Sequence, residues 1–229
     1  MALPKTEFLF TVEEYLAMER EADERHEYLD GIVYAMAGES DEHSEICANL
    51  SWLLGTQLRG APCRMRIANT KVRSGPRPIL PRSRKGLFSY PDLLVVCGER
   101  EYFDEFKDVL LNPMVIFEVL SKSTQDFDRG EKFLRYQLWN PELKDYVLVS
   151  QTSPTIEHYS RRPDGSWNYR TYRGLKATLT LKSIKCNLPL QQIYERVQFP
   201  PEKSRALATP KKTTKPQKKK TTASKGRKK

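Results

Sequence analysis

No hydrophobic run in this 229-residue sequence reaches membrane-spanning length, and its first residues lack the long apolar stretch of a secretory signal. We therefore expect no association with a membrane. Only four cysteines and three histidines are present, without a Cys-x-x-Cys pair or a histidine cluster. This scarcity argues against a zinc site and against a disulfide framework, and it predicts a cytoplasmic protein in a reducing compartment.

Several catalytic motifs are also missing. The sequence has no glycine-rich phosphate-binding loop, no Ser-His-Asp ordering and no His-Glu-x-x-His motif. Nucleotide hydrolysis, acyl transfer and zinc proteolysis therefore have no support. With 38% hydrophobic residues, the chain can still bury a substantial core, and its length predicts one domain with appendages.

The net charge of +10 is concentrated at the C-terminal end. Residues 201–229 contain 12 Lys or Arg and a single acid, whereas residues 1–200 contain 27 basic and 28 acidic residues. The terminal segment is nearly free of apolar side chains, a composition typical of disorder. We therefore predict a folded domain over residues 1–199 and a disordered lysine-rich tail over residues 200–229. The tail either tethers nucleic acid nonspecifically or serves solubility.

A second basic segment lies inside the predicted domain. Residues 59–85 contain nine Lys or Arg and no acid, immediately upstream of Asp92. Such a surface would attract a phosphate backbone and make binding salt-dependent. A solvated face with loop arginines is the alternative. The candidates for nucleic-acid binding in this segment are Arg64, Arg66, Lys71 and Arg73.

The hydrophobic pattern alternates between helices and strands, which predicts an α/β or α+β fold with a mixed sheet. A capping box at Thr11 and an Asp30-Gly31 turn give the clearest local signals. We expect helices over residues 12–20, 41–58, 128–138 and 188–197. We expect strands over residues 25–37 (as a hairpin), 63–73, 93–97, 115–120, 145–150, 156–161 and 167–172, with an irregular loop over 75–86.

Two carboxylates stand beside short, fully apolar segments of strand length. Asp92 precedes residues 93–97, and Glu118 follows the apolar residues 114–117. If these strands are neighbours, both carboxylates converge and suit a hard cation such as Mg²⁺ or Mn²⁺, with the Val119 main-chain carbonyl as a further ligand. The alternative for Asp92 is a residue that only caps or shapes a turn. Glu118 is harder to explain, because an unpaired buried carboxylate is costly.

Metal-dependent nucleases also need a cation near the attacking water, and Lys122 and Lys132 are the candidates. Asp128 and Lys132 are four residues apart, so spacing alone favours a surface ion pair. Arg129, Lys132 and Tyr136 also share a helical face that would suit a phosphate. Two further residues are ambiguous: His43 is either exposed in the first turn of its helix or near the site, and Glu27 is either paired, solvated or functional.

Together these pieces resemble the Uma-type family of restriction endonucleases, a branch of the PD-(D/E)XK nuclease superfamily. The resemblance rests on Tyr90-Pro91-Asp92-Leu93, Glu118-Val119-Leu120-Ser121, Ser123-Thr124, Asp128, Lys132 and Tyr136, preceded by Glu27-Tyr28-Leu29-Asp30-Gly31, Met36-Ala37 and His43. It covers about residues 8–197. After Tyr136 the chain departs from the family pattern, and the lysine-rich tail is not part of the family core.

The resemblance implies helices around a mixed four- or five-stranded sheet and a Mg²⁺-dependent endonuclease that hydrolyses DNA phosphodiesters. Asp92 and Glu118 would bind the metal. The superfamily lysine is replaced here by Leu120, which makes Lys132 on the following helix a better candidate than Lys122. Glu27 and His43 are secondary site residues. Related nucleases often cut as homodimers.

Two alternatives to a nuclease remain: a catalytically inactive nucleic-acid-binding protein, and a non-nuclease partner protein that uses the fold as a scaffold.

Overall fold

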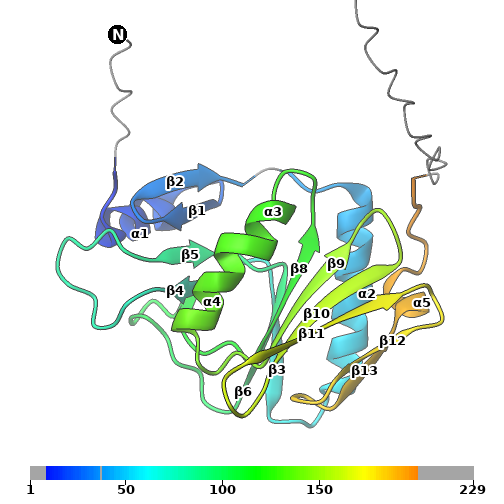
Figure 1. The fold of residues 1–229 in the computed structure, drawn as a ribbon. Helices are drawn as coiled ribbons and strands as arrows, with labels where there is room; N and C mark the ends of the chain where they lie inside the picture. Colours follow the sequence, from blue (N-terminus) through cyan, green and yellow to red (C-terminus); the bar gives the residue numbers. More distant parts are fainter. Residues whose placement is uncertain (1–8, 37, 201–229) are drawn as a thin grey trace, which may run out of the picture.

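The computed structural model describes residues 9–36 and 38–200, so the predicted tail from residue 201 onward lies outside it. The largest sheet has six strands in the order β11-β10-β9-β8-β6-β3 (Figure 1). Only β8 and β9 pair in parallel, so the sheet is mixed, as predicted. Its strands are β3 (Cys63–Ile67), β6 (Leu93–Cys97), β8 (Val115–Leu120), β9 (Asp145–Ser150), β10 (Thr155–Arg161) and β11 (Trp167–Arg173).

A second sheet contains five short strands in the order β2-β1-β5-β4-β7. Helix α1 (Val12–Glu21) belongs to this part of the fold and begins at the predicted capping box of Thr11 and Glu14. Asp30 and Gly31 have φ angles of 47° and 104°, the left-handed pair that a tight hairpin turn requires. The strands are β1 (His26–Leu29), β2 (Ile32–Ala35), β4 (Lys71–Ser74), β5 (Leu87–Ser89) and β7 (Val109–Leu110).

Helices cover both faces of the six-stranded sheet (Figure 1). Helix α2 (Asp41–Gln57) begins at Ser40, whose hydroxyl accepts a hydrogen bond from the His43 N–H. On the other face, α3 (Gln125–Phe127) and α4 (Phe133–Trp139) are joined by a π-helical segment, η1 (Asp128–Lys132). The hairpin of β12 (Thr178–Leu181) and β13 (Cys186–Pro189) follows, and α5 (Leu190–Ile193) is the last helix of the described residues.

The strand side chains alternate between two hydrophobic cores. Val115 and Phe117 pack in the core that contains the leucines of α2, whereas Ile116 and Leu120 pack in the core that contains Phe133 of α4. This alternation follows from the two-residue period of a strand. The fully apolar sequence of β8 around Glu118 is thereby explained, since both of its faces are buried.

Several predicted elements need correction. The single strand expected over residues 63–73 is two strands in different sheets, because the chain turns at Ala68, which has a φ of 28°. Strands β5, β7, β12 and β13 were not predicted, and the last helix is much shorter than residues 188–197. The main sheet has six strands, where the resemblance implied four or five.

The expectation of a chain without disulfides is wrong for one pair of cysteines. Cys63 and Cys97 are bonded to each other, whereas Cys47 and Cys186 are free thiols. The antiparallel register of β3 and β6 places Cys63 directly opposite Cys97, a relation that sequence spacing does not reveal. Among the described helices, none has the length and apolar character needed to cross a membrane.

Candidate active site

The candidate site lies where β6 begins beside β8. Leu93, the first residue of β6, is paired with Phe117, so β8 continues beyond the start of its neighbour. Asp92 fills this gap: its Oδ2 accepts a hydrogen bond of 2.6 Å from the Val119 main-chain N–H. The predicted convergence of the two strand ends is therefore present, with Asp92 next to residues 118 and 119.

Glu118 points to the face of the sheet that carries η1 and α4, because it has the same parity as Ile116 and Leu120. Its side chain is buried, and Lys132 Nζ lies 3.5 Å from its Oε1. Lys132 belongs to η1, and π-helical segments of this kind are frequent at functional sites. The π-helical segment thus places the ammonium group of Lys132 beside the Glu118 carboxylate near the end of β8.

Lys132 is surrounded by three carboxylates. Besides Glu118, its Nζ lies 2.8 Å from Asp128 Oδ1 and 3.3 Å from Glu27 Oε1. The ion pair that the spacing of Asp128 and Lys132 predicts is present, but its expected place at the surface is wrong, since both residues are buried. Packing of η1 against β8, which the i,i+4 spacing cannot show, excludes them from solvent.

This burial strongly shifts the titration of the cluster. Desolvation, together with repulsion from Asp128, Asp92 and Glu27, outweighs the attraction of Lys132 and raises the pKa of Glu118 well above its usual value. Desolvation alone would lower the pKa of Lys132, but the surrounding carboxylates hold it well above its usual value. The lysine therefore remains a cation inside a group of acids.

Glu27 connects this cluster to the segment that carries Asp92. The same Oε1 that contacts Lys132 also accepts a hydrogen bond of 3.3 Å from the Tyr90 main-chain N–H. Tyr90 is separated from Asp92 only by Pro91, whose ring restricts the backbone. Of the alternatives for Glu27, the structure shows the paired one, within the candidate site.

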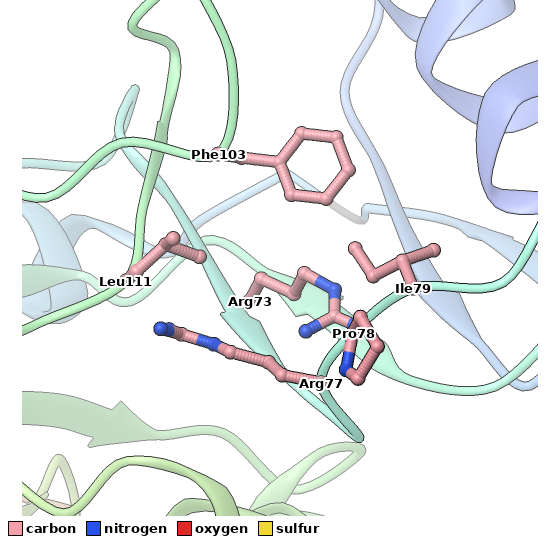
Figure 2. Close-up of a pocket in the computed structure, with 6 residues that line it drawn as sticks. All are labelled: Arg73, Arg77, Pro78, Ile79, Phe103 and Leu111. Atoms are coloured by element: carbon pink, nitrogen blue, oxygen red, sulfur yellow. The ribbon is translucent and has the colours of Figure 1, made fainter.

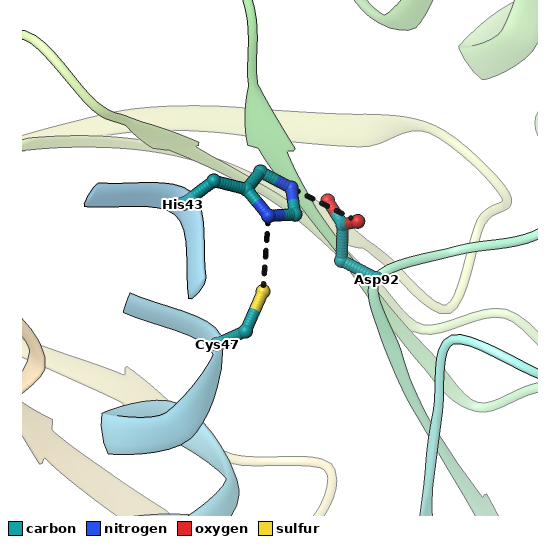
Figure 3. Close-up of side chains that lie close together, drawn as sticks. All are labelled: His43, Cys47 and Asp92. Atoms are coloured by element: carbon teal, nitrogen blue, oxygen red, sulfur yellow. Dashed lines mark hydrogen bonds and ion pairs between the residues drawn. The ribbon is translucent and has the colours of Figure 1, made fainter. Parts of the chain in front are cut away.

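His43 reaches the site from α2 (Figure 3). Its Nε2 lies 3.1 Å from Asp92 Oδ1, and its Nδ1 lies 2.7 Å from Glu39 Oε2. Burial alone would lower the pKa of His43, but hydrogen bonds with Asp92 and Cys47 raise it to about 11. The imidazolium thus binds one oxygen of the Asp92 carboxylate while the Val119 N–H binds the other, and the two contacts together orient it.

Cys47 is a neighbour of the site that was not predicted. Its Sγ lies 3.8 Å from His43 Nδ1, one helical turn further along α2 (Figure 3). Ligand atoms of His43, Cys47 and Asp92 all lie within 4.8 Å of one another, a compact set of nitrogen, sulfur and oxygen donors. The i,i+4 spacing of His43 and Cys47 was the available signal. This His-x-x-x-Cys spacing differs from the two sequence signals of a zinc site, a Cys-x-x-Cys pair and a histidine cluster, both of which the sequence lacks.

The oxygen donors suit a hard divalent cation. Within the part of the chain that the structure describes, Glu118 Oε1 is buried without a hydrogen-bond partner, and its nearest cation, Lys132 Nζ, is 3.5 Å away. A buried acceptor of this kind is costly unless something else neutralises it. Asp92 keeps lone pairs on both oxygens beyond its bonds to His43 and Val119. The residues present therefore fit Mg²⁺ or Mn²⁺.

The predicted nucleic-acid contacts divide into two groups. Arg64 and Arg66 lie on β3 opposite Val96 and Leu94, whose side chains face the α4 side of the sheet, so these arginines project from the same face as Glu118. Arg129 is partly exposed, but Glu157 binds its guanidinium at 2.7 Å.

Lys122, the other candidate for the catalytic lysine, is exposed and, among the described residues, forms no ion pair with the site.

Lys71 and Arg73 do not fit the prediction that they contact nucleic acid. Both are buried, because other side chains cover them: Asp108 and Tyr90 contact Lys71, and the rings of Phe88 and Phe103 lie against Arg73. Lys71 Nζ lies 2.9 Å from Asp108 Oδ2 and donates a hydrogen bond to the Tyr90 hydroxyl at 3.2 Å. Lys71 thus supports the residue that precedes Pro91-Asp92.

The ion pairs of Asp108 predict a loss of stability in acid. Burial alone would raise the pKa of Asp108, but Arg20 and Lys71 lower it below its usual value. Its contribution to stability is therefore complete above the unfolded pKa of about 3.9 and is lost as the pH falls below it. We expect Asp108→Asn to lower the urea midpoint at pH 7, with a difference from wild type that shrinks by pH 3. The exposed Asp23→Asn is the matched control, and an equal difference at both pH values would contradict the interpretation.

The fold and the site together define the class of protein. It is an α/β protein with a mixed sheet, in which carboxylates surround one buried lysine at the ends of adjacent strands. A family model described as "Uma2: Putative restriction endonuclease" matches residues 12–191. The chain belongs to this Uma2 family, and the resemblance inferred from its motifs is confirmed.

Individual relatives agree with this assignment. The uncharacterized protein slr1290 of Synechocystis sp. (strain ATCC 27184 / PCC 6803 / Kazusa) is 36% identical over 187 residues, covering 82% of this chain and 92% of the relative. The uncharacterized protein sll1609 of the same organism is 29% identical over 185 residues, covering 81% and 99%. The crystal structure of a putative nuclease belonging to DUF820 from Anabaena variabilis ATCC 29413 is similar with a TM-score of 0.63. At 14% identity over 81% of this chain and 97% of that one, the similarity establishes the restriction-endonuclease-like fold.

Proposed function

We propose that the protein is a Mg²⁺- or Mn²⁺-dependent endonuclease that hydrolyses phosphodiester bonds of DNA. The observation that carries the proposal is the contact of Lys132 Nζ with Glu118 Oε1 at 3.5 Å, beside an Asp92 that is bonded to Val119. Membership of a family described as restriction endonucleases, and structural similarity to the putative nuclease from Anabaena variabilis, support the same class of reaction.

Asp92 and Glu118 would hold the metal. The N–H and C=O of one strand residue point to the same side of the strand. Because the Val119 N–H donates to Asp92, the Val119 main-chain carbonyl would face the same side and serve as a further ligand. When bound, the ion would lower the pKa of its water and offset charge on the phosphate. This donor set consists of oxygen atoms alone, the type that Mg²⁺ prefers.

The remaining residues position these groups. The Lys132 ammonium supplies fixed positive charge where the phosphate becomes more negative, and it is the proposed group that orients the attacking water. Glu27 and Asp128 hold Lys132 in place, and His43 holds the Asp92 carboxylate. Arg64 and Arg66, on the same face of the sheet as Glu118, would contact the DNA backbone.

The proposal is tested with the full chain and supercoiled plasmid. We expect nicking or linearisation in Mg²⁺ or Mn²⁺, none in chelator, and loss of cleavage in Asp92→Ala. Cleavage that persists unchanged in Asp92→Ala would come from a contaminating nuclease and would contradict the proposal. Salt-sensitive DNA binding without cleavage would favour the inactive binding protein instead.

Two finer predictions accompany the proposal. A homodimer is tested by light scattering of the purified chain. A cytoplasmic location was inferred from sparse cysteines, and the Cys63–Cys97 bond weighs against a strongly reducing environment. Peptide mapping of unreduced protein from its native host would show which state the cysteines have in the cell.

A further inference from the structure

We propose that a pocket beside β4 binds a small phosphate monoester with an apolar body. The cavity has a volume of about 230 Å³ and is lined by Arg73, Arg77, Pro78, Ile79, Phe103 and Leu111 (Figure 2). None of these residues belongs to the candidate active site. The pocket is therefore a separate site, whose ligand does not depend on the proposed nuclease activity.

Arg73 is the residue that most clearly needs a ligand. It is only 2% exposed, and within the described residues no carboxylate lies within ion-pairing distance of it. Its two terminal nitrogens donate to the carbonyl oxygens of Gly75 at 3.2 Å and Pro76 at 2.9 Å, but its Nε–H has no partner there. A buried cation without a counterion is costly, and a bound anion would relieve that cost.

Arg77 adds a second positive charge to the same pocket (Figure 2). Its ion pair with Glu101 is long, at 3.8 Å, and joins two exposed side chains, so it neutralises little. Burial, followed by repulsion from Arg77, lowers the pKa of Arg73 to about 10. Two guanidinium groups match a phosphate monoester, which carries a charge of about −1.5 to −2, better than a single carboxylate.

The rest of the lining indicates an apolar body on the ligand. Pro78, Ile79, Phe103 and Leu111 form the remaining walls, and Figure 2 shows the Phe103 ring and Ile79 above the two arginine side chains. Inorganic phosphate would leave these walls in contact with water. A ring or short alkyl group attached to the phosphate would cover them and gain from the apolar area removed from water.

The pocket is held in shape by a close crossing of two chain segments. A Cβ at Gly75 would lie 2.8 Å from the Gly86 Cα and 3.3 Å from the Arg73 terminal nitrogen, so only glycine fits at this position. The guanidinium is thereby fixed against the backbone before any ligand arrives. Such preorganisation lowers the cost of binding.

Isothermal titration of the full chain with phenyl phosphate, inorganic phosphate and benzoate tests the proposal. We expect saturable binding of phenyl phosphate, and an affinity about tenfold lower for inorganic phosphate and for benzoate. Arg77→Ala should weaken phenyl phosphate binding at least about tenfold. Leu111→Trp, which fills the cavity, should abolish it. Arg82→Ala is the matched control, because it removes an exposed arginine of the same loop outside the pocket and should change nothing.

Each contrary result has a distinct meaning. Absence of saturable binding overturns the site, as does binding that is unchanged in both Arg77→Ala and Leu111→Trp. Equal weakening by Arg82→Ala would overturn it in favour of attraction to a diffuse positive surface. Equal affinity for inorganic phosphate would overturn the apolar body. Because Asp92→Ala should still bind phenyl phosphate, failure of the nuclease proposal and failure of this one can be told apart.

Discussion

Glu118→Gln is expected to reduce plasmid cleavage by about 10³-fold, the loss found when a group that stabilises the transition state is removed. Glutamine has nearly the same shape but no negative charge, so it binds a divalent cation weakly. The fold should survive the change, because Lys132 keeps Asp128 at 2.8 Å and Glu27 at 3.3 Å. Cleavage at several metal concentrations and urea unfolding are the two measurements.

This substitution separates catalysis from stability. Burial already disfavours the charged form of Glu118, so a neutral side chain should leave the unfolding midpoint near that of wild type. The exposed Glu105→Gln is the matched control, and it should alter neither measurement. Glu118→Gln protein that is folded and fully active would rule out Glu118 as a metal ligand.

Lys132→Met is expected to damage both stability and activity. Methionine preserves most of the length of the side chain but leaves Glu27, Glu118 and Asp128 without their shared cation. Removing one partner of a buried ion pair typically costs about 3–5 kcal/mol of unfolding free energy. We therefore expect a large fall in the urea midpoint, and a loss of cleavage of at least about 10²-fold.

Lys132→Arg keeps the activity prediction testable if Lys132→Met fails to fold. Arginine retains the charge, but its planar group does not match a site built around a single ammonium. We expect a folded protein with strongly reduced cleavage. The exposed Lys122→Met is the control for both variants, since its loss should leave stability and cleavage unchanged. If Lys122→Met instead removed activity while Lys132→Arg retained it, the assignment of the catalytic lysine would be wrong.

Local signals predicted much of the fold. The Thr11 capping box, the Asp30-Gly31 turn and the apolar runs that became β6 and β8 each depend on a few consecutive residues, and each is present. The strand ends that carry Asp92 and Glu118 were also placed correctly side by side.

Features that depend on tertiary packing were predicted poorly. The sequence could not show that Lys71 and Arg73 are buried, because the groups that cover them, such as Phe103 and Asp108, lie about 30 or more residues further along the chain. The buried state of Asp128, the π-helical segment and the Cys63–Cys97 bond share this dependence. In each case a local rule, such as i,i+4 spacing or cysteine separation, gave a reasonable answer that long-range packing overrode.

The disulfide joins the outer strand of the main sheet, β3, to its neighbour covalently at one end only. Cys63 and Cys97 join β3 to β6 covalently, whereas the other end of β3 is held by hydrogen bonds from the Ala68 N–H to the Asp92 carbonyl and from Arg25 to the Ala68 carbonyl. We therefore expect any separation of β3 from β6 to begin beside Asp92, where hydrogen bonds alone join the strands, and to stop at the cysteines.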